Sequence, residues 1–81
     1  MLREDLYAKV IDVIADSLDM DAEELGEEAA FDELGADSFD LLEMVTALEE
    51  EFDVRCDDSV LTEVRTVGDA VDAIAEALGA E

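Results

Sequence analysis

GADSFDLLEMVTALEEEF, residues Gly35 to Phe52, is the stretch of this chain that predicts most about its fold. Asp37 is a residue type favoured at helix N-caps, and Ser38 follows it at the first helical position. Apolar side chains then recur at the spacing of one helix face: Leu41, Met44, Val45, Leu48 and Phe52. The stretch therefore predicts an amphipathic α-helix that buries this face.

A second apolar pair, Phe39 and Leu42, lies off that face. Each residue is about 100° around the helix from a core position at 3.6 residues per turn. Leu42 is four residues after Ser38, so their side chains are neighbours. Large apolar groups outside a core face often mark an interaction site, and we therefore expect Phe39 and Leu42 to contact partners.

Two further long helices are predicted on either side of this one. The first runs from about Arg3 to Leu18, with Leu2 and Ile11 flanking an apolar face of Leu6, Val10, Val13, Ile14 and Leu18. The last is capped by Thr66, with Asp69 placed to complete a capping box, and it ends at Gly79. Its apolar face consists of Val67, Val71, Ile74 and Leu78.

The segments between these helices are less regular. In the connection of residues 19–36, Asp21 is expected to cap one helical turn that Gly26 stops, and Gly35 to supply a positive φ. The residues expected to anchor this connection to the core are Met20, Leu25, Phe31 and Leu34. A short helix from Ser59 to Val64, capped by Asp57 or Asp58, is expected to turn Leu61 and Val64 inward.

The sequence therefore predicts an all-α fold, a bundle of three main helices with one short helix before the last. No segment alternates with period two for long, and no apolar run approaches the ~20 residues of a membrane span. A chain of 81 residues is the size of one small domain, so we expect residues 1–81 to form a single domain and a monomer.

Composition excludes several functions. The chain has 26 Asp and Glu against 4 Lys and Arg, a net charge of −22, which repels nucleic acid and attracts basic protein surfaces. It has no His, so a Ser-His-Asp triad or a His-ligated metal is excluded. A single Cys and the absence of a secretion signal agree with a cytoplasmic location.

The abundant acids make calcium the first metal ion to consider. Asp19, Asp21 and Glu23 imitate the first ligands of an EF-hand loop. The sixth position is then Glu24 in place of Gly, and the twelfth is Ala30 in place of Glu. The motif fails, and no specific metal site is predicted.

The central stretch resembles the modification site of acyl carrier proteins, in which an Asp-Ser-Leu begins an acidic helix. The wider pattern is similar too: Phe31, then LGADS, then EEEFDV, then Thr66-Val67 at the start of the last helix. The chain departs from the family at Phe39, where Leu is usual, and at Val54-Arg55-Cys56-Asp57, where an Ile-Pro pair is common.

The resemblance implies an acyl-carrier-like bundle with 4′-phosphopantetheine, taken from coenzyme A, on Ser38 beside Asp37. It implies a non-catalytic protein, the substrate of a phosphopantetheinyl transferase, that carries acyl thioesters between fatty-acid synthesis enzymes with basic docking patches. The expected partner-binding residues are Phe39, Asp40, Leu42, Glu43, Thr46, Glu49 and Glu50.

Two alternatives stay open at this point. Phe39 in place of Leu leaves room for a carrier in polyketide, aryl or D-alanyl transfer. A rival of another class is an acidic bundle without catalytic activity that blocks nucleic-acid-binding proteins by mimicking their ligand. The sequence does not identify the acyl chain or the particular partner enzymes.

Overall fold

The computed structural model describes residues 2–56 and 59–79. Its elements are α1 (Arg3–Leu18), the short 3-10 helix η1 (Ala22–Glu24), α2 (Ser38–Phe52), α3 (Val60–Glu63) and α4 (Val67–Leu78). Within these residues the only β-pairing is one isolated antiparallel bridge between Ala30 and Thr66. The all-α prediction of three main helices and one short helix is confirmed.

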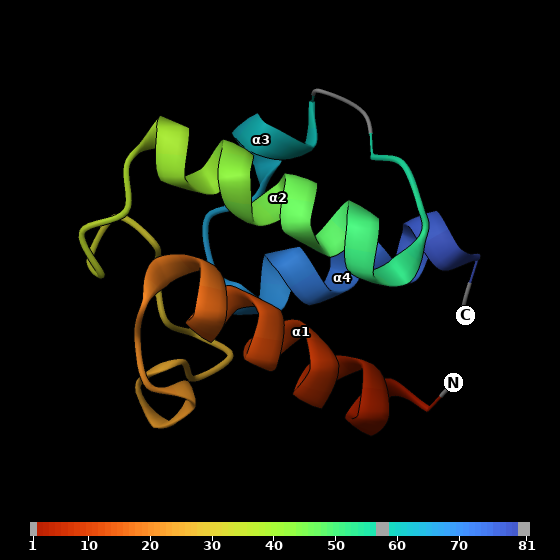
Figure 1. Ribbon diagram of the computed structural model, residues 1–81, viewed down its shortest axis with the longest axis horizontal. Helices are drawn as coiled ribbons and strands as arrows, with labels where there is room; N and C mark the ends of the chain where they lie inside the picture. Colours follow the sequence, from red (N-terminus) through yellow and green to blue (C-terminus); the bar gives the residue numbers. More distant parts are fainter. Residues whose placement is uncertain (1, 57–58, 80–81) are drawn as a thin grey trace.

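The three long helices surround one core. Figure 1 shows α1 and α2 running in opposite directions, with α4 behind them, packed against both. The loops that join α1 to α2 gather at the left of this view, next to the first turn of α2. No helix among the described residues is long and apolar enough to cross a membrane.

Most of the predicted core residues are buried, with differences at the ends of the helices. Ile11 belongs to the core, whereas Val13 and Leu18 are half-buried. Leu2 is exposed because it precedes α1 as its N-cap, and Leu78 is exposed on the last residue of α4. The core comprises Leu6, Val10, Ile11, Ile14, Leu25, Phe31, Met44, Val45, Leu48, Val64, Val67, Ala70, Val71 and Ile74.

The short helix α3 is smaller than predicted. Ser59 is its N-cap rather than its first residue, and Val64 is its C-cap with an extended backbone. Val64 is buried and Leu61 half-buried, so the predicted inward side is correct. The expected caps, Asp57 and Asp58, lie outside the described residues.

The long connection between α1 and α2 is held in place by its own anchors. Leu25 and Phe31 are buried, whereas Met20 and Leu34 only pack against the core from its edge. The backbone N–H of Phe31 donates to the carbonyl oxygen of Arg65 at 2.9 Å, and the N–H of Val67 donates to that of Ala29 at 3.0 Å. The connection is thereby fixed to the start of α4.

Local turn chemistry follows the sequence closely. Asp21 and Glu24 form a capping box on η1, and Thr66 and Asp69 form another on α4. Gly35 has φ of +84°, a left-handed backbone that residues with a Cβ rarely adopt. This glycine turns the chain into α2.

Ion pairs offset little of the negative charge on the surface. In the described part of the chain, the ion pairs within 4.0 Å all involve Arg3, whose Nη2 lies 2.6 Å from Asp72 Oδ1 and 3.9 Å from Glu27 Oε1. These side chains are more than half exposed, and such pairs stabilise a fold only slightly. The remaining carboxylates repel one another when the chain folds.

We therefore expect the melting temperature to rise from low to moderate sodium chloride, because salt screens repulsion over a Debye length of about 10 Å at 0.1 M. Millimolar calcium or magnesium should raise it further at matched ionic strength, by binding the folded arrangement of acids in preference to the unfolded chain. Thermal melts in the two series test this. A flat or falling melting temperature in both would show that charge repulsion does not limit the stability of this fold.

Candidate functional site

The candidate site lies at the first turn of α2. Asp37 is the N-cap, and its Oδ1 accepts a hydrogen bond from the backbone N–H of Asp40 at 2.9 Å. In return, Asp40 Oδ2 accepts one from the backbone N–H of Asp37 at 3.2 Å. This reciprocal capping box fixes where the helix begins. Ser38 is therefore held as the first residue of α2, with its side chain exposed.

Ser38 lies on the edge of a concavity of about 520 Å³. Its walls come from the loop before α2, the first turn of α2, and the segment from α3 to the start of α4. The residues that line it are Phe31, Asp32, Ala36, Asp37, Ser38, Leu41, Leu61, Thr62, Val64 and Arg65. A group attached to Ser38 can therefore lie along the surface between α2 and α3.

The surroundings of Ser38 offer it no activation as a nucleophile. The chain has no His, and the polar neighbours closest in sequence are carboxylates that already cap the helix. No cluster of three or more His, Cys, Asp or Glu suited to a metal ion occurs among the described residues. The described neighbours of Ser38 therefore include no base of the kind that activates a serine hydroxyl as a nucleophile.

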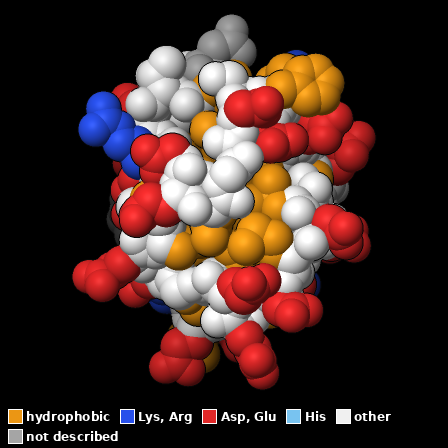
Figure 2. Space-filling view, turned by 90° about the vertical axis from the view of Figure 1, so that its left-hand side faces the viewer, with side chains coloured by type: hydrophobic (Ala, Val, Ile, Leu, Met, Phe, Trp, Pro, Cys, Tyr) orange, Lys and Arg blue, Asp and Glu red, His pale blue; other side chains and the backbone are white. Residues whose placement is uncertain are grey.

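The predicted contact patch is exposed beside Ser38. Phe39 is 65% exposed and Leu42 is 47% exposed, so neither residue packs in the core. Glu43, Thr46 and Glu50 are also exposed further along α2. Figure 2 shows the end of the molecule that faces left in Figure 1, with apolar side chains in its centre and acidic side chains around them.

Two predicted partner-binding acids also have structural roles that sequence reasoning missed. Asp40 caps α2 and is half-buried. Glu49 is half-buried as well, and its Oε2 accepts a hydrogen bond from the backbone N–H of Cys56 at 2.7 Å, which fastens the segment after α2. The spacing of Asp37 and Asp40 already matched a capping box, whereas nothing in the sequence indicated the bond between Glu49 and Cys56.

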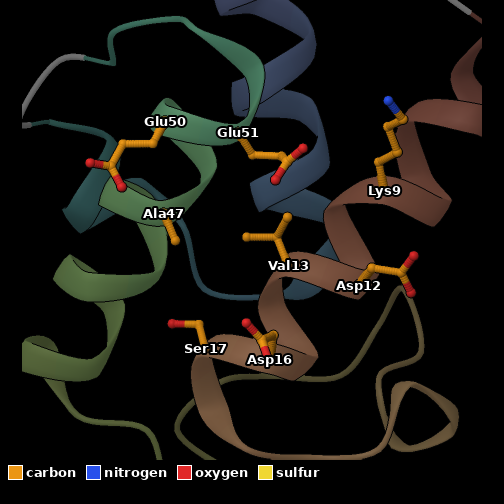
Figure 3. Close-up of a pocket in the computed structure, with 8 residues that line it drawn as sticks. All are labelled: Lys9, Asp12, Val13, Asp16, Ser17, Ala47, Glu50 and Glu51. Atoms are coloured by element: carbon orange, nitrogen blue, oxygen red, sulfur yellow. The ribbon is translucent and has the colours of Figure 1, made fainter.

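A larger concavity, of about 690 Å³, lies between α1 and α2 (Figure 3). Ala47, the lining residue nearest to Ser38 along α2, is about 13 Å along the helix axis at 1.5 Å per residue. Lys9 and Ser17 line it together with acids from both helices, with no base beside Ser17 except carboxylates. The larger volume of this concavity alone therefore does not make it the functional site.

Comparisons with known proteins identify the class to which this chain belongs. The family model described as "Phosphopantetheine attachment site" matches residues 8–74, which include α2 and the loop before it. The fold and the exposed serine thus define a domain of the class that carries phosphopantetheine.

The relatives narrow this class. An acyl carrier protein of Phenylobacterium zucineum is 47% identical over 77 residues, covering 94% of this chain and 98% of that protein. The crystal structure of an acyl carrier protein from Thermotoga maritima has a TM-score of 0.81 and 34% identity over 95% of this chain and 91% of its own. The chain belongs to the acyl carrier protein family. Its function is that of an acyl carrier, and its prosthetic group is 4′-phosphopantetheine.

A third similar chain comes from a structure described as "The ishigamide ketosynthase/chain length factor". The TM-score is 0.76 and the identity 30%, covering 90% of this chain and 93% of that one. The family to which these proteins belong is one of carriers without catalytic activity of their own, and acyl carrier proteins work with synthase enzymes.

Alanine substitutions of two phenylalanines test whether the core and the contact patch consist of different residues. Phe31 is 1% exposed, so Phe31→Ala should destabilise the fold by about 3–5 kcal/mol, as for other buried Phe residues. Phe39→Ala should cost well under that, because Phe39 is exposed. Transfer of phosphopantetheine to Phe39→Ala should nevertheless slow clearly. Denaturant unfolding and transfer rates measure the two effects.

The two variants serve as controls for each other, since both remove the same side chain. Equal losses of unfolding free energy would show that Phe39 packs in the core. An unchanged transfer rate for Phe39→Ala would show that the patch does not contact the transferase.

Proposed function

We propose that Ser38 carries 4′-phosphopantetheine, and that this chain moves acyl groups between separate enzymes of fatty-acid synthesis in the cytoplasm. We further propose that residues 1–81 act as one monomeric carrier domain. The observation that supports this most is the exposed Ser38 at the first position of α2, on the edge of a concavity.

The residues at this position fit a phosphodiester. The first turn of a helix presents backbone N–H groups and the positive end of the helix dipole, which favour an anion. Asp37 takes up the N–H of Asp40, but the N–H groups of Ser38 and Phe39 have no acceptor among the described residues. When bound, the group supplies a terminal thiol that forms thioesters with acyl chains.

The chain itself supplies position and recognition. Because Ser38 has no base beside it, the group must be attached by a phosphopantetheinyl transferase acting on this chain as its substrate. The acids along α2, among them Glu43 and Glu50, attract partners with basic surfaces. Phe39 and Leu42, exposed next to Ser38, give such partners an apolar contact.

A polyketide pathway is the second candidate. The similar chain from the structure of the ishigamide ketosynthase/chain length factor supports it, and so does Phe39 at a position where carriers of fatty-acid synthesis usually have Leu. Loading the modified chain with a fatty-acyl or polyketide starter and measuring transfer to a ketosynthase of each type would separate the two pathways.

The attachment site is tested by mass. Incubation with coenzyme A and a broad-specificity transferase should add one phosphopantetheine to the wild-type chain, and Ser38→Ala should abolish the addition. Ser38 is exposed at the end of a helix, so the variant should keep its circular dichroism spectrum. Intact-mass spectrometry gives the result.

Ser17→Ala is the matched control, since Ser17 lies in the concavity between α1 and α2 and should be irrelevant to attachment. An unmodified wild-type chain, with a known carrier modified in the same reaction mixture, would refute the proposal.

Partner association should respond to salt in the opposite sense to stability. The acids attract basic partner surfaces, so the rate of transferase association should fall as sodium chloride increases. Measuring kcat/KM of transfer at several salt concentrations, below the temperature at which the chain unfolds, tests this. A rate that is independent of salt would mean that the acids do not steer partners.

A further inference from the structure

We propose that Arg65 is a positioning residue for the prosthetic arm: its guanidinium binds the phosphodiester on Ser38 and keeps the arm in the concavity between α2 and α3. This inference rests on the proposed attachment at Ser38. It assigns a role to a residue that lies 27 positions further along the chain and outside the contact patch on α2.

The first support is the shared concavity. Ser38 and Arg65 line the same space of about 520 Å³. Of the described residues that line it, Arg65 alone is cationic, whereas Asp32 and Asp37 are acidic. In a chain with only 4 Lys and Arg against 26 acids, a cation beside the attachment serine has a clear electrostatic consequence.

The backbone fixes where Arg65 lies relative to Ser38. The carbonyl oxygen of Arg65 accepts the N–H of Phe31 at 2.9 Å, and its own N–H donates to Asp69 Oδ2 at 3.1 Å. The carbonyl oxygen of Phe31 accepts the N–H of Ala36 at 3.0 Å, just before the N-cap of α2. Phe31 therefore connects Arg65 to the start of α2 through two hydrogen bonds.

The side chain of Arg65 is available for an anion. Arg65 is exposed and makes no ion pair within 4.0 Å with any part of the chain that the structure describes, whereas Arg3 pairs with Asp72 and Glu27. A guanidinium offers five N–H donors in a planar fork that matches phosphate oxygens in pairs.

The phosphodiester in turn needs a cation at this place. It adds a negative charge to an edge that already carries Asp32 and Asp37. The helix terminus compensates only in part, since Asp37 already accepts the N–H of Asp40. Arg65 supplies the remaining positive charge, and this attraction favours arm conformations that lie along α3 over those that extend into solvent.

Nuclear magnetic resonance of the modified chain tests this without measuring activity. Wild type, Arg65→Gln and Arg65→Lys are each loaded from coenzyme A labelled in the pantetheine amides. The measured quantities are the phosphorus-31 shift of the phosphodiester, the heteronuclear NOE of the arm amides, and the shift differences between modified and unmodified chains at Leu61 and Thr62. Arg55→Gln is the matched control, because Arg55 is an exposed arginine that lines a separate concavity with Cys56, Val60, Ala73, Glu76 and Ala77.

Arg65→Gln should lower the docked fraction of the arm about two- to fivefold, the effect of losing one exposed ion pair. The arm amides should become more mobile, and high salt should bring the wild type to the same state. Arg65→Lys should keep part of the effect, since it retains the charge but not the planar fork. Arg55→Gln should match the wild type.

Two failures are distinguishable. If no chain gains the mass of the arm, the proposed attachment fails, and the role of Arg65 fails with it. If every chain gains it, and Arg65→Gln has the phosphorus shift and arm mobility of wild type, only the role of Arg65 is refuted. Equal changes in Arg65→Gln and Arg55→Gln would also refute it, because they would indicate an effect of net charge.

Discussion

The rest of this structure depends on Phe31, which is held both by its buried side chain and by its backbone hydrogen bonds. Its side chain is buried in the core, its N–H donates to Arg65, and its carbonyl oxygen accepts from Ala36. One residue thus joins the connection before α2 to the segment before α4 and to the core between the helices. The start of α2, where Ser38 lies, is thus held by Phe31 together with the capping box of Asp37 and Asp40.

These contacts of Phe31 matter because the folded state of such a small, highly charged domain is only marginally stable. A small domain leaves much of its apolar surface exposed, and the carboxylates here repel one another over its whole surface. The structure uses some of these acids as hydrogen-bond acceptors for otherwise unpaired N–H groups. Asp40 and Asp69 cap helices, and Glu49 holds the chain after α2. These carboxylates stabilise the fold through hydrogen bonds although they add to the negative charge of the chain.

The sequence predicted what depends on short-range periodicity and capping. The bounds of α1, the caps Asp37 and Thr66, and the exposure of Phe39 all follow from spacings of three and four residues. What it could not predict depends on contacts between distant segments. The bond from Cys56 to Glu49 and the nearness of Arg65 to Ser38 have no local signal. Ile11, predicted to flank the apolar face of α1, is buried in the core because the buried side of the helix is wide enough to include it.

Phe31 and Phe39 lie in opposite environments, one in the core and one on the surface. They are the same residue type, eight positions apart, yet one is 1% exposed and the other 65%. Between them, Gly35 turns the chain with its positive φ, and the capping box at Asp37 begins α2, so that the buried Phe31 and the exposed Phe39 lie on either side of this turn. A carrier needs a buried anchor and an exposed surface, because its attachment site must be accessible to other enzymes while the helix that holds it stays in place. Burying Phe39 would remove the apolar surface beside Ser38, and exposing Phe31 would release the loop that positions this serine. The turn at Gly35 and the capping box at Asp37 therefore allow one short segment to meet both requirements.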